Sequence, residues 1–284
     1  MKKILVPCDF SKTAINAFRF ALDIAHKSKG VIHLLHVIEI PVMYDTVLMP
    51  ALNFEQELYK ELKVNAEQQF INMLTKYNTE QVKVSAHVEY GTTASTLLDY
   101  TEKESIDLIV MGSHGTSGLH EVFVGSNAEK IVRRARVPVL VVKEFFKGKV
   151  TDIVFPNTLE LGNQEDLLMA VKGLQEFFNA KLHLLWINTP LNFTSDTVTL
   201  ERLEAFAKRF LLKNYSIHVF NHLNEEEGIL QFSKLIKADM IAMATHGRKG
   251  LAHILNGSLA ESVVNHTDQL IWTYTLRNET DSAL

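Results

Sequence analysis

Short apolar runs alternate with longer stretches of helical periodicity along the first half of the chain. Residues 4–6 form a continuous apolar run, which is typical of a strand buried on both faces. Ser11 then offers an N-cap, and Gly30 follows as a stop signal. Between them, small and apolar residues recur at helical spacing: Ala14, Ala17, Phe18, Ala21, Ile24 and Ala25. This pattern predicts a strand, a short loop and an amphipathic helix that ends at Gly30.

The same alternation continues to residue 142. It predicts further strands at 31–38, 82–88, 108–111 and 139–142, and helices at 54–77, 94–103 and 126–136. Strands and helices that alternate through short connections favour a parallel sheet with helices on both faces. We therefore predict an α/β fold, a doubly wound unit with a five-stranded parallel sheet.

A second copy of this unit fills the rest of the chain. The segment 107–115 matches 239–247, and the same offset of 132 residues carries Gly125 and Ser126 onto Gly257 and Ser258. Near the front of each copy, residues 4–7 match 153–156, an offset of 149, so the second copy has lost residues in between. Self-similarity of this length indicates a tandem repeat. We predict domains of residues 1–146 and 147–284, joined in the polar segment 143–149.

Each copy ends in an apolar strand, at 139–142 and at 270–274. An exposed edge of that character invites pairing with another strand. We therefore predict that the two copies pack through these strands as an intramolecular pseudo-dimer. Association of whole chains into a homodimer stays open.

Composition excludes several classes of protein. Lys and Arg number 29 against 33 Asp and Glu, a net charge of −4 that argues against a nucleic-acid binder. The single cysteine, Cys8, excludes an internal disulfide framework and an all-cysteine metal cage. No apolar run approaches the roughly 20 residues that span a bilayer, and the run after Lys3 stops at Pro7, too short for a signal peptide. We expect a soluble, cytoplasmic protein without a membrane or nucleic-acid partner.

Doubly wound sheets bind ligands beyond the carboxyl ends of their strands, where the strand order reverses. The positions to examine are therefore Cys8 and Asp9, then 37–39, then Gly112 onward. The last of these reads Gly112-Ser-His-Gly115, nine residues, Gly125-Ser126. Glycines let a backbone approach a ligand closely, and a helix that opens at Ser126 would present free N–H groups to phosphate.

Ser126 also has a purely structural interpretation. With Glu129 it matches the S-x-x-E capping box, in which the serine hydroxyl caps its own helix. Capping and phosphate binding compete for one hydroxyl, so both interpretations stay open.

The spaced glycine motif resembles the nucleotide-binding signature of the universal stress protein family. Segments 4–11, 35–38 and 137–142 resemble the family too, and the resemblance covers essentially the whole chain as a tandem pair. It implies units that bind ATP, or else ADP or AMP, with Mg²⁺ as an accompanying metal, and that pair through their last strands. The implied binding residues are Pro7, Asp9, Val37, Met111, Gly112, Gly115, Gly125, Ser126 and Asn127.

The resemblance also implies a role for these residues. Asp9 would meet the adenine–ribose end and Val37 would offer backbone to adenine. The glycines would admit ribose and phosphates, and the Gly125-Ser126-Asn127 segment would hold the phosphate tail. Cys8 departs from the small or polar residue common at its position, and we expect it to be a small buried residue.

The sequence lacks the correctly spaced motifs of other nucleotide-binding and catalytic sites. Gly148-Lys149 is followed by Val150, so there is no Walker loop. No G-x-G-x-x-G follows a strand, and neither H-E-x-x-H nor G-x-S-x-G occurs. We predict no catalytic residues. The twelve histidines are expected to be core or loop-bonding imidazoles, with no metal site predicted: His33, His36, His183, His218 and His222 on or beside strands, and His114 and His246 in loops.

Three functions stay open. The first is a regulatory stress protein that binds an adenine nucleotide without turnover. The second is a partner-binding structural stress protein without nucleotide. The third is a weak ATPase, which would need a carboxylate near the phosphates, where Glu121 and Glu129 are the nearby acids.

The second copy has a degenerate form of the motif. Thr158 stands opposite Asp9, Ala244 opposite Gly112, and Ile187 opposite Val37. The second copy keeps the motif residues Gly247, Gly257 and Ser258, and it adds positive charge at Arg248 and Lys249. We predict that the first copy is the competent nucleotide site and that the second could hold no more than a phosphate or another anion.

Overall fold

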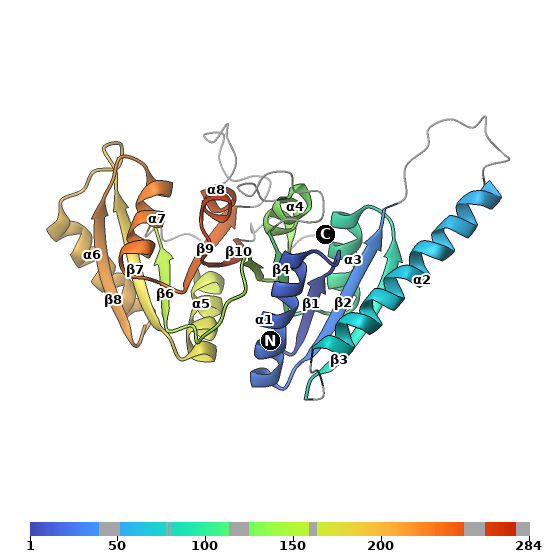
Figure 1. Ribbon diagram of the computed structural model, residues 1–284. Helices are drawn as coiled ribbons and strands as arrows, with labels where there is room; N and C mark the ends of the chain where they lie inside the picture. Colours follow the sequence, from blue (N-terminus) through green and yellow to red (C-terminus); the bar gives the residue numbers. More distant parts are fainter. Residues whose placement is uncertain are drawn as a thin grey trace. The chain divides into compact units, whose positions relative to one another are not determined.

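The computed structural model describes residues 1–39, 52–77, 79, 81–113, 125–158, 164–246 and 259–276 (Figure 1). The chain divides into two compact units. The first holds the described residues up to 131 and residues 142–145, and the second holds 132–141 and the described residues from 146 onward. Each repeat contributes five described strands, as predicted. No described helix is long and apolar enough to cross a bilayer.

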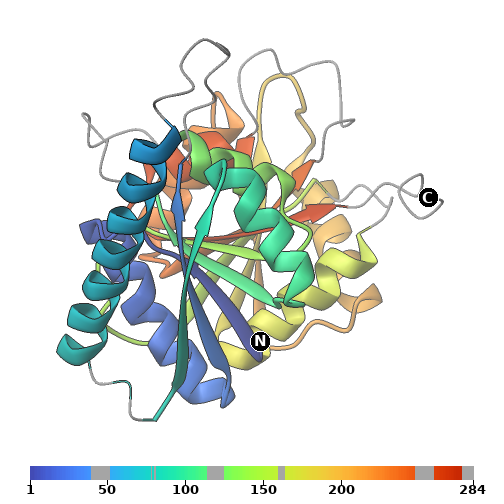
Figure 2. The ribbon, with the colours of Figure 1, turned by 90° about the vertical axis from the view of Figure 1, so that its right-hand side faces the viewer.

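The first unit is a parallel sheet in the order β3-β2-β1-β4. Figure 2 shows α1 and α2 on one side of strands β1–β3 and α3 on the other, as in a doubly wound fold. The elements are β1 (Lys3–Pro7), α1 (Lys12–Ser28), β2 (Val31–Ile38), α2 (Leu52–Lys76), β3 (Lys83–Tyr90), α3 (Thr93–Lys103), β4 (Leu108–Gly112) and residues 126–131 of α4 (Ser126–Arg134).

The second unit has the strand order β5-β10-β9-β6-β7-β8. Its elements are β5 (Val139–Val142, residues 139–141 in this unit), β6 (Asp152–Pro156), α5 (Glu165–Phe178), β7 (Lys181–Asn188), α6 (Asp196–Arg209), β8 (Tyr215–Asn221), α7 (Glu225–Leu235), β9 (Met240–His246), α8 (Leu259–His266) and β10 (Leu270–Leu276). β5 pairs antiparallel with β10, with Leu140 opposite Trp272. The predicted pairing of these two strands is confirmed.

Helix α1 shows how local signals set an element. Ser11 caps it as predicted, since its Oγ accepts a hydrogen bond from the Ala14 N–H at 3.2 Å. The helix ends at Ser28, and the left-handed residue that stops it is Lys29 (φ 52°) rather than Gly30. Gly30 is needed for packing, because a Cβ there would lie 2.8 Å from the Lys2 carbonyl oxygen.

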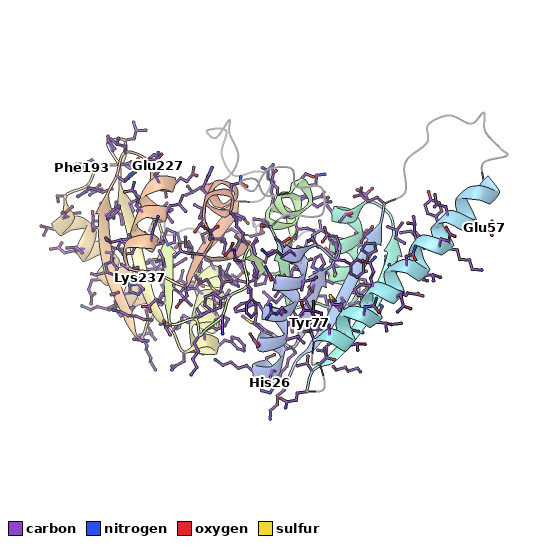
Figure 3. All side chains as sticks on the ribbon, viewed as in Figure 1. His26, Glu57, Tyr77, Phe193, Glu227 and Lys237 are labelled. Atoms are coloured by element: carbon purple, nitrogen blue, oxygen red, sulfur yellow. The ribbon has the colours of Figure 1, made fainter. Side chains whose placement is uncertain are left out.

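The hydrophobic core of the first unit lies between sheet and helices. The apolar stripe of α1 is buried as predicted, and Phe18 on it is fully inaccessible. Tyr77, labelled in Figure 3, follows α2 and packs edge-on against Phe18 with 6.2 Å between ring centroids. This contact joins the two helices that cover one face of the sheet.

Gly112, at the end of β4, allows α1 to start close to the sheet. A Cβ on Gly112 would lie 2.8 Å from the carbonyl carbon of Thr13 and 2.9 Å from the amide nitrogen of Ala14. We expect Gly112→Ala to lower the free energy of unfolding by about 1–3 kcal/mol, because the backbone of α1 must shift. Urea unfolding of the full chain measures this change.

Gly173 provides a matched control for that substitution. It lies inside α5, where a Cβ would meet nothing within 4 Å. Gly173→Ala should therefore raise the free energy of unfolding by about 0.5–1 kcal/mol through helix propensity alone. Equal effects of the two substitutions would contradict the packing argument at Gly112.

Candidate functional site

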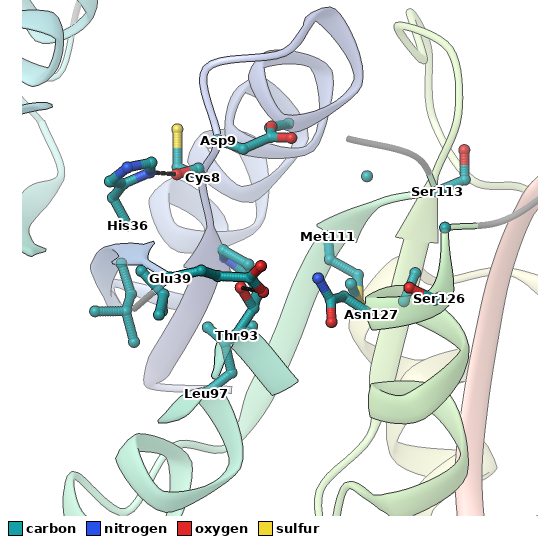
Figure 4. A pocket seen from close by; sticks show the side chains of 17 residues that line it. Cys8, Asp9, His36, Glu39, Thr93, Leu97, Met111, Ser113, Ser126 and Asn127 are labelled. Carbon is teal, nitrogen blue, oxygen red and sulfur yellow. Dashed lines mark hydrogen bonds between the residues drawn. The ribbon is translucent and has the colours of Figure 1, made fainter. Parts of the chain in front are cut away.

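A cavity of about 340 Å³ lies at the carboxyl ends of β1, β2 and β4 in the first unit (Figure 4). This is the end of the sheet at which a doubly wound fold binds ligands, and the volume suits a small molecule. Eight of the nine predicted residues line it: Pro7, Asp9, Val37, Met111, Gly112, Gly125, Ser126 and Asn127. The ninth, Gly115, lies outside the described residues.

The loop between β1 and α1 presents Asp9 to the cavity. Phe10 takes a left-handed backbone (φ 64°), a conformation that costs free energy for a residue with a side chain. Its ring is held between His36 at 5.1 Å and Phe70 at 4.9 Å. The Ser11 N–H donates to Asp9 Oδ1 at 3.0 Å. Packing and hydrogen bonding thus fix the carboxylate in one orientation.

His36 supports the same loop from β2. Its Nδ1 donates to the Cys8 carbonyl oxygen at 2.8 Å, the dashed line in Figure 4, while the Cys8 N–H donates to the Leu35 carbonyl at 2.9 Å. The expectation of a loop-bonding imidazole is confirmed for His36. Cys8 is buried, also as expected.

The environment of Cys8 predicts an unreactive thiol. Burial, reinforced by the charge of Asp9, raises the pKa of the Cys8 thiol to about 12. Because the thiolate is the nucleophile, only about 1 in 10⁴ molecules would carry it at pH 8. We expect the folded chain to react with a thiol-specific disulfide reagent at least about 100-fold more slowly than the chain unfolded in guanidinium chloride. Equal rates would contradict this assignment.

Two polar residues that the implied set left out also line the cavity. Thr93, the first residue of α3, donates through Oγ1 to Glu39 Oε1 at 2.7 Å. In Figure 4 they lie on the side of the cavity opposite Ser126 and Asn127. Glu39 lies in segment 37–39, which the sequence marks as a place to look for ligand-binding residues. Thr93 follows the third strand, whose end was not among those places, although Gly91 signals a turn there.

The start of α4 forms another wall. The Glu129 N–H donates to the Gly125 carbonyl at 3.1 Å, the first bond of the helix. Gly125 therefore occupies the cap position, and the predicted capping box of Ser126 and Glu129 is wrong. The Gly125 N–H donates to the Ser113 carbonyl at 2.7 Å, which ties α4 to the end of β4. The first N–H groups of a helix have no partner within it, so this wall offers donors to an anion.

Gly112 contributes to the site indirectly. We expected its missing Cβ to leave room for a ligand, but the space is taken by the first turn of α1 at Thr13. The close approach of helix and strand is what the glycine permits. Gly112 still lines the cavity with its backbone.

Charge is unevenly distributed around the cavity. Asp9 and Glu39 are carboxylates, and the described lining contains no Lys or Arg. The segment 114–124 between the glycines, which lies outside the described residues, has no Lys or Arg in its sequence either. His114 and Glu121 belong to that segment. The N-terminus of α4 therefore contributes positive potential at the cavity.

In the second unit, the corresponding end of the sheet, at the carboxyl ends of its strands, is built differently. The Asn157 N–H donates to the Leu185 carbonyl, as Cys8 does to Leu35, which supports the alignment of Thr158 with Asp9. The connection from β6 to α5 takes eight residues, against four from β1 to α1. The predicted anion-holding residues lie outside the described part of the chain, as does the side chain of His246: Gly247, Arg248, Lys249, Gly257 and Ser258.

Comparison with known proteins agrees with this architecture. The family model described as "Universal stress protein family" matches residues 1–143 and, a second time, residues 167–272. The chain belongs to the universal stress protein family. It carries two such domains in tandem.

Individual relatives match either one domain or the whole chain. Universal stress protein MJ0531 of Methanocaldococcus jannaschii is 33% identical over 144 residues, 50% of this chain and 82% of that protein. Universal stress protein Slr1230 of Synechocystis sp. is 24% identical over 290 residues, 96% of this chain and all of that protein. A solved universal stress protein from Archaeoglobus fulgidus covers 98% of this chain and 97% of its own, with a TM-score of 0.71 and 18% identity, a likeness of fold.

Proposed function

We propose that the first domain of this universal stress protein binds an adenine nucleotide, ATP before ADP or AMP, and that the chain acts as a regulator rather than a turnover enzyme. One observation carries the proposal. Eight of the residues that the family resemblance implies line a single cavity at the ligand-binding end of the sheet. We further propose that this domain comprises residues 1–146 and that residues 147–284 form the second.

The chemistry of the lining suits each part of a nucleotide. Apolar Leu35 and Leu97, together with the backbone at Val37, offer an environment for a base. The Asp9 carboxylate can accept hydrogen bonds from ribose hydroxyls or an exocyclic amino group. The N–H groups at the start of α4 can receive phosphate oxygens.

A counter-cation would complete the match. Free ATP is a polyanion, and the lining carries two carboxylates without a Lys or Arg side chain among the described residues. Mg²⁺ bound with the nucleotide would offset phosphate charge at this site. We therefore expect ATP to bind more tightly with Mg²⁺ present than with a chelator present.

Two measurements test the proposal. The purified chain is denatured and any released small molecule is identified by mass spectrometry, and the nucleotide-free chain is titrated with ATP, ADP and AMP by calorimetry. A released or titrating adenine nucleotide would support the proposal. A chain that neither releases nor binds one would overturn it and favour the partner-binding alternative.

The weak-ATPase alternative has a separate readout. Glu39 is the lining carboxylate besides Asp9, and it already accepts a hydrogen bond from Thr93. Phosphate release that Glu39→Gln abolishes would support turnover. Retained nucleotide without phosphate release would support a regulatory function.

A further inference from the structure

A cluster of polar side chains crosses three neighbouring strands of the second unit. Asp152 opens β6, His183 lies on β7, and Ser216 and His218 lie on β8. His183 stands directly opposite Ser216 in the β7–β8 register. The proposed nucleotide cavity belongs to the first unit, so this cluster is independent of it.

The cluster brings three lone-pair atoms together. His183 Nδ1 lies 3.0 Å from Ser216 Oγ and 3.2 Å from His218 Nε2. Ser216 Oγ lies 2.8 Å from His218 Nε2. The second nitrogen of His183, Nε2, donates to Asp152 Oδ1 at 2.8 Å.

The protonation of the cluster follows from these contacts. Burial alone would raise the pKa of Asp152, but hydrogen bonds from His183 and Thr151 outweigh it and lower that pKa. An ionised carboxylate only accepts, so a neutral His183 carries its proton on Nε2 and turns the Nδ1 lone pair toward the other two atoms. Burial, and then the neighbouring His183 and Lys181, lower the pKa of His218 to about 4, which favours its neutral imidazole form.

Two hydrogen bonds can join the three atoms in a chain, but they cover only two of the three edges. The serine hydroxyl and one His218 nitrogen supply at most two protons for three edges. The longest edge, between the two ring nitrogens, is then left without a proton. A cation at the centre would satisfy all three lone pairs together.

We propose that His183 Nδ1, Ser216 Oγ and His218 Nε2 form a site for a divalent transition-metal ion of the zinc class. Zinc–nitrogen bonds of 2.0–2.1 Å separate neighbouring tetrahedral ligands by about 3.3 Å, a few tenths of an ångström more than these edges. Imidazole nitrogens suit Zn²⁺, Cu²⁺ and Ni²⁺. Asp152 holds the second nitrogen of His183, as carboxylates do for metal-ligating histidines.

The donor set also limits the strength of the site. Among the described residues, no three His, Cys, Asp or Glu side chains converge as metal ligands. Two imidazoles and a hydroxyl leave the coordination shell to be completed by water, so the ion would be exchangeable.

The same cluster also resembles the catalytic triad of a hydrolase, with Asp152, His183 and Ser216 in sequence. In this chain, however, the serine oxygen is held on its other side by His218.

The first unit repeats the residue types without the arrangement. Its counterparts are Lys3, His33, Ser85 and His87, with His33 opposite Ser85 in the register. A lysine replaces the aspartate, and His33 Nδ1 is hydrogen-bonded to the Tyr100 hydroxyl at 3.0 Å. The rings of His33 and His87 stack at an interplanar angle of 15° instead of converging on one point. These histidines serve as an internal control.

Calorimetric titration of the full, nucleotide-free chain with ZnCl₂ at pH 7.5 tests the proposal. We expect one binding event that His218→Gln removes and that Asp152→Asn weakens about 10–100-fold. The matched His87→Gln should leave it unchanged. Co²⁺ should give visible absorption bands that disappear in His218→Gln, and circular dichroism verifies that each variant is folded.

The opposite results would overturn the site. These are no zinc binding at all, binding that persists in both His218→Gln and Asp152→Asn, or an equal loss in His87→Gln. Asp152→Asn keeps the shape of the side chain, so it remains informative even where a histidine variant fails to fold.

Discussion

Asp9→Asn is expected to weaken ATP binding by the first domain by about 10–100-fold. Asparagine keeps the Oδ1 acceptor that receives the Ser11 N–H, so the loop before α1 should stay in place. What disappears is the negative charge that strengthens hydrogen bonds from nucleoside donors, a loss of about 1–3 kcal/mol. Calorimetric titration with ATP in the presence of Mg²⁺ measures the change in Kd.

Asp99→Asn is the matched control for that measurement. Asp99 lies exposed on α3 and does not line the cavity. The same charge removed there should leave the affinity unchanged, since exposed charges are screened. If the two variants bound ATP as the parent chain does, Asp9 would not contact the nucleotide, and the carry-over of its role from the family motif would be wrong.

The fold could be predicted from the sequence because its signals are local. A buried strand needs only a continuous apolar run, and α1 needs only a cap at Ser11 and an apolar stripe. The repeat of these signals then predicted two units. The errors at helix ends have the same origin: Lys29 stops α1 and Gly125 caps α4 because of backbone geometry that residue type alone does not specify.

The parts of the site that escaped prediction depend on contacts between distant segments. Glu39 and Thr93 are 54 residues apart in the chain and meet because β2 and β3 are neighbours. Position 112 requires a glycine because the backbone of Thr13, on another element, lies too close for a Cβ. A motif can mark such positions, but it cannot say which neighbour they touch.

The histidines illustrate the same limit. His36 and His222 bond backbone carbonyls of loop residues, as expected of loop-bonding imidazoles. The convergence of His183 and His218 depends on the register of β7 against β8, which apolar periodicity does not encode. Their cluster therefore becomes visible only in the structure.

A titration of the full chain with ATP is expected to give one nucleotide site rather than two. The second domain has Thr158 where the first has Asp9, and threonine lacks the carboxylate charge. Its β6–α5 connection is also four residues longer than the β1–α1 loop that holds Asp9. Ala244 stands opposite Gly112, but the Gly112 geometry assigns that position to helix packing, so the asymmetry rests on the loop and the missing carboxylate.

Paired variants distinguish the two domains in that titration. Asp9→Asn should weaken the single site, whereas Thr158→Ala should leave both its stoichiometry and its affinity unchanged. Two sites of similar affinity, or one site that responds to Thr158→Ala and not to Asp9→Asn, would contradict the asymmetry. In the expected case one domain responds to nucleotide while its tandem copy does not. Nucleotide binding would then act on one half of each chain, a difference that a homodimer of identical single domains does not possess.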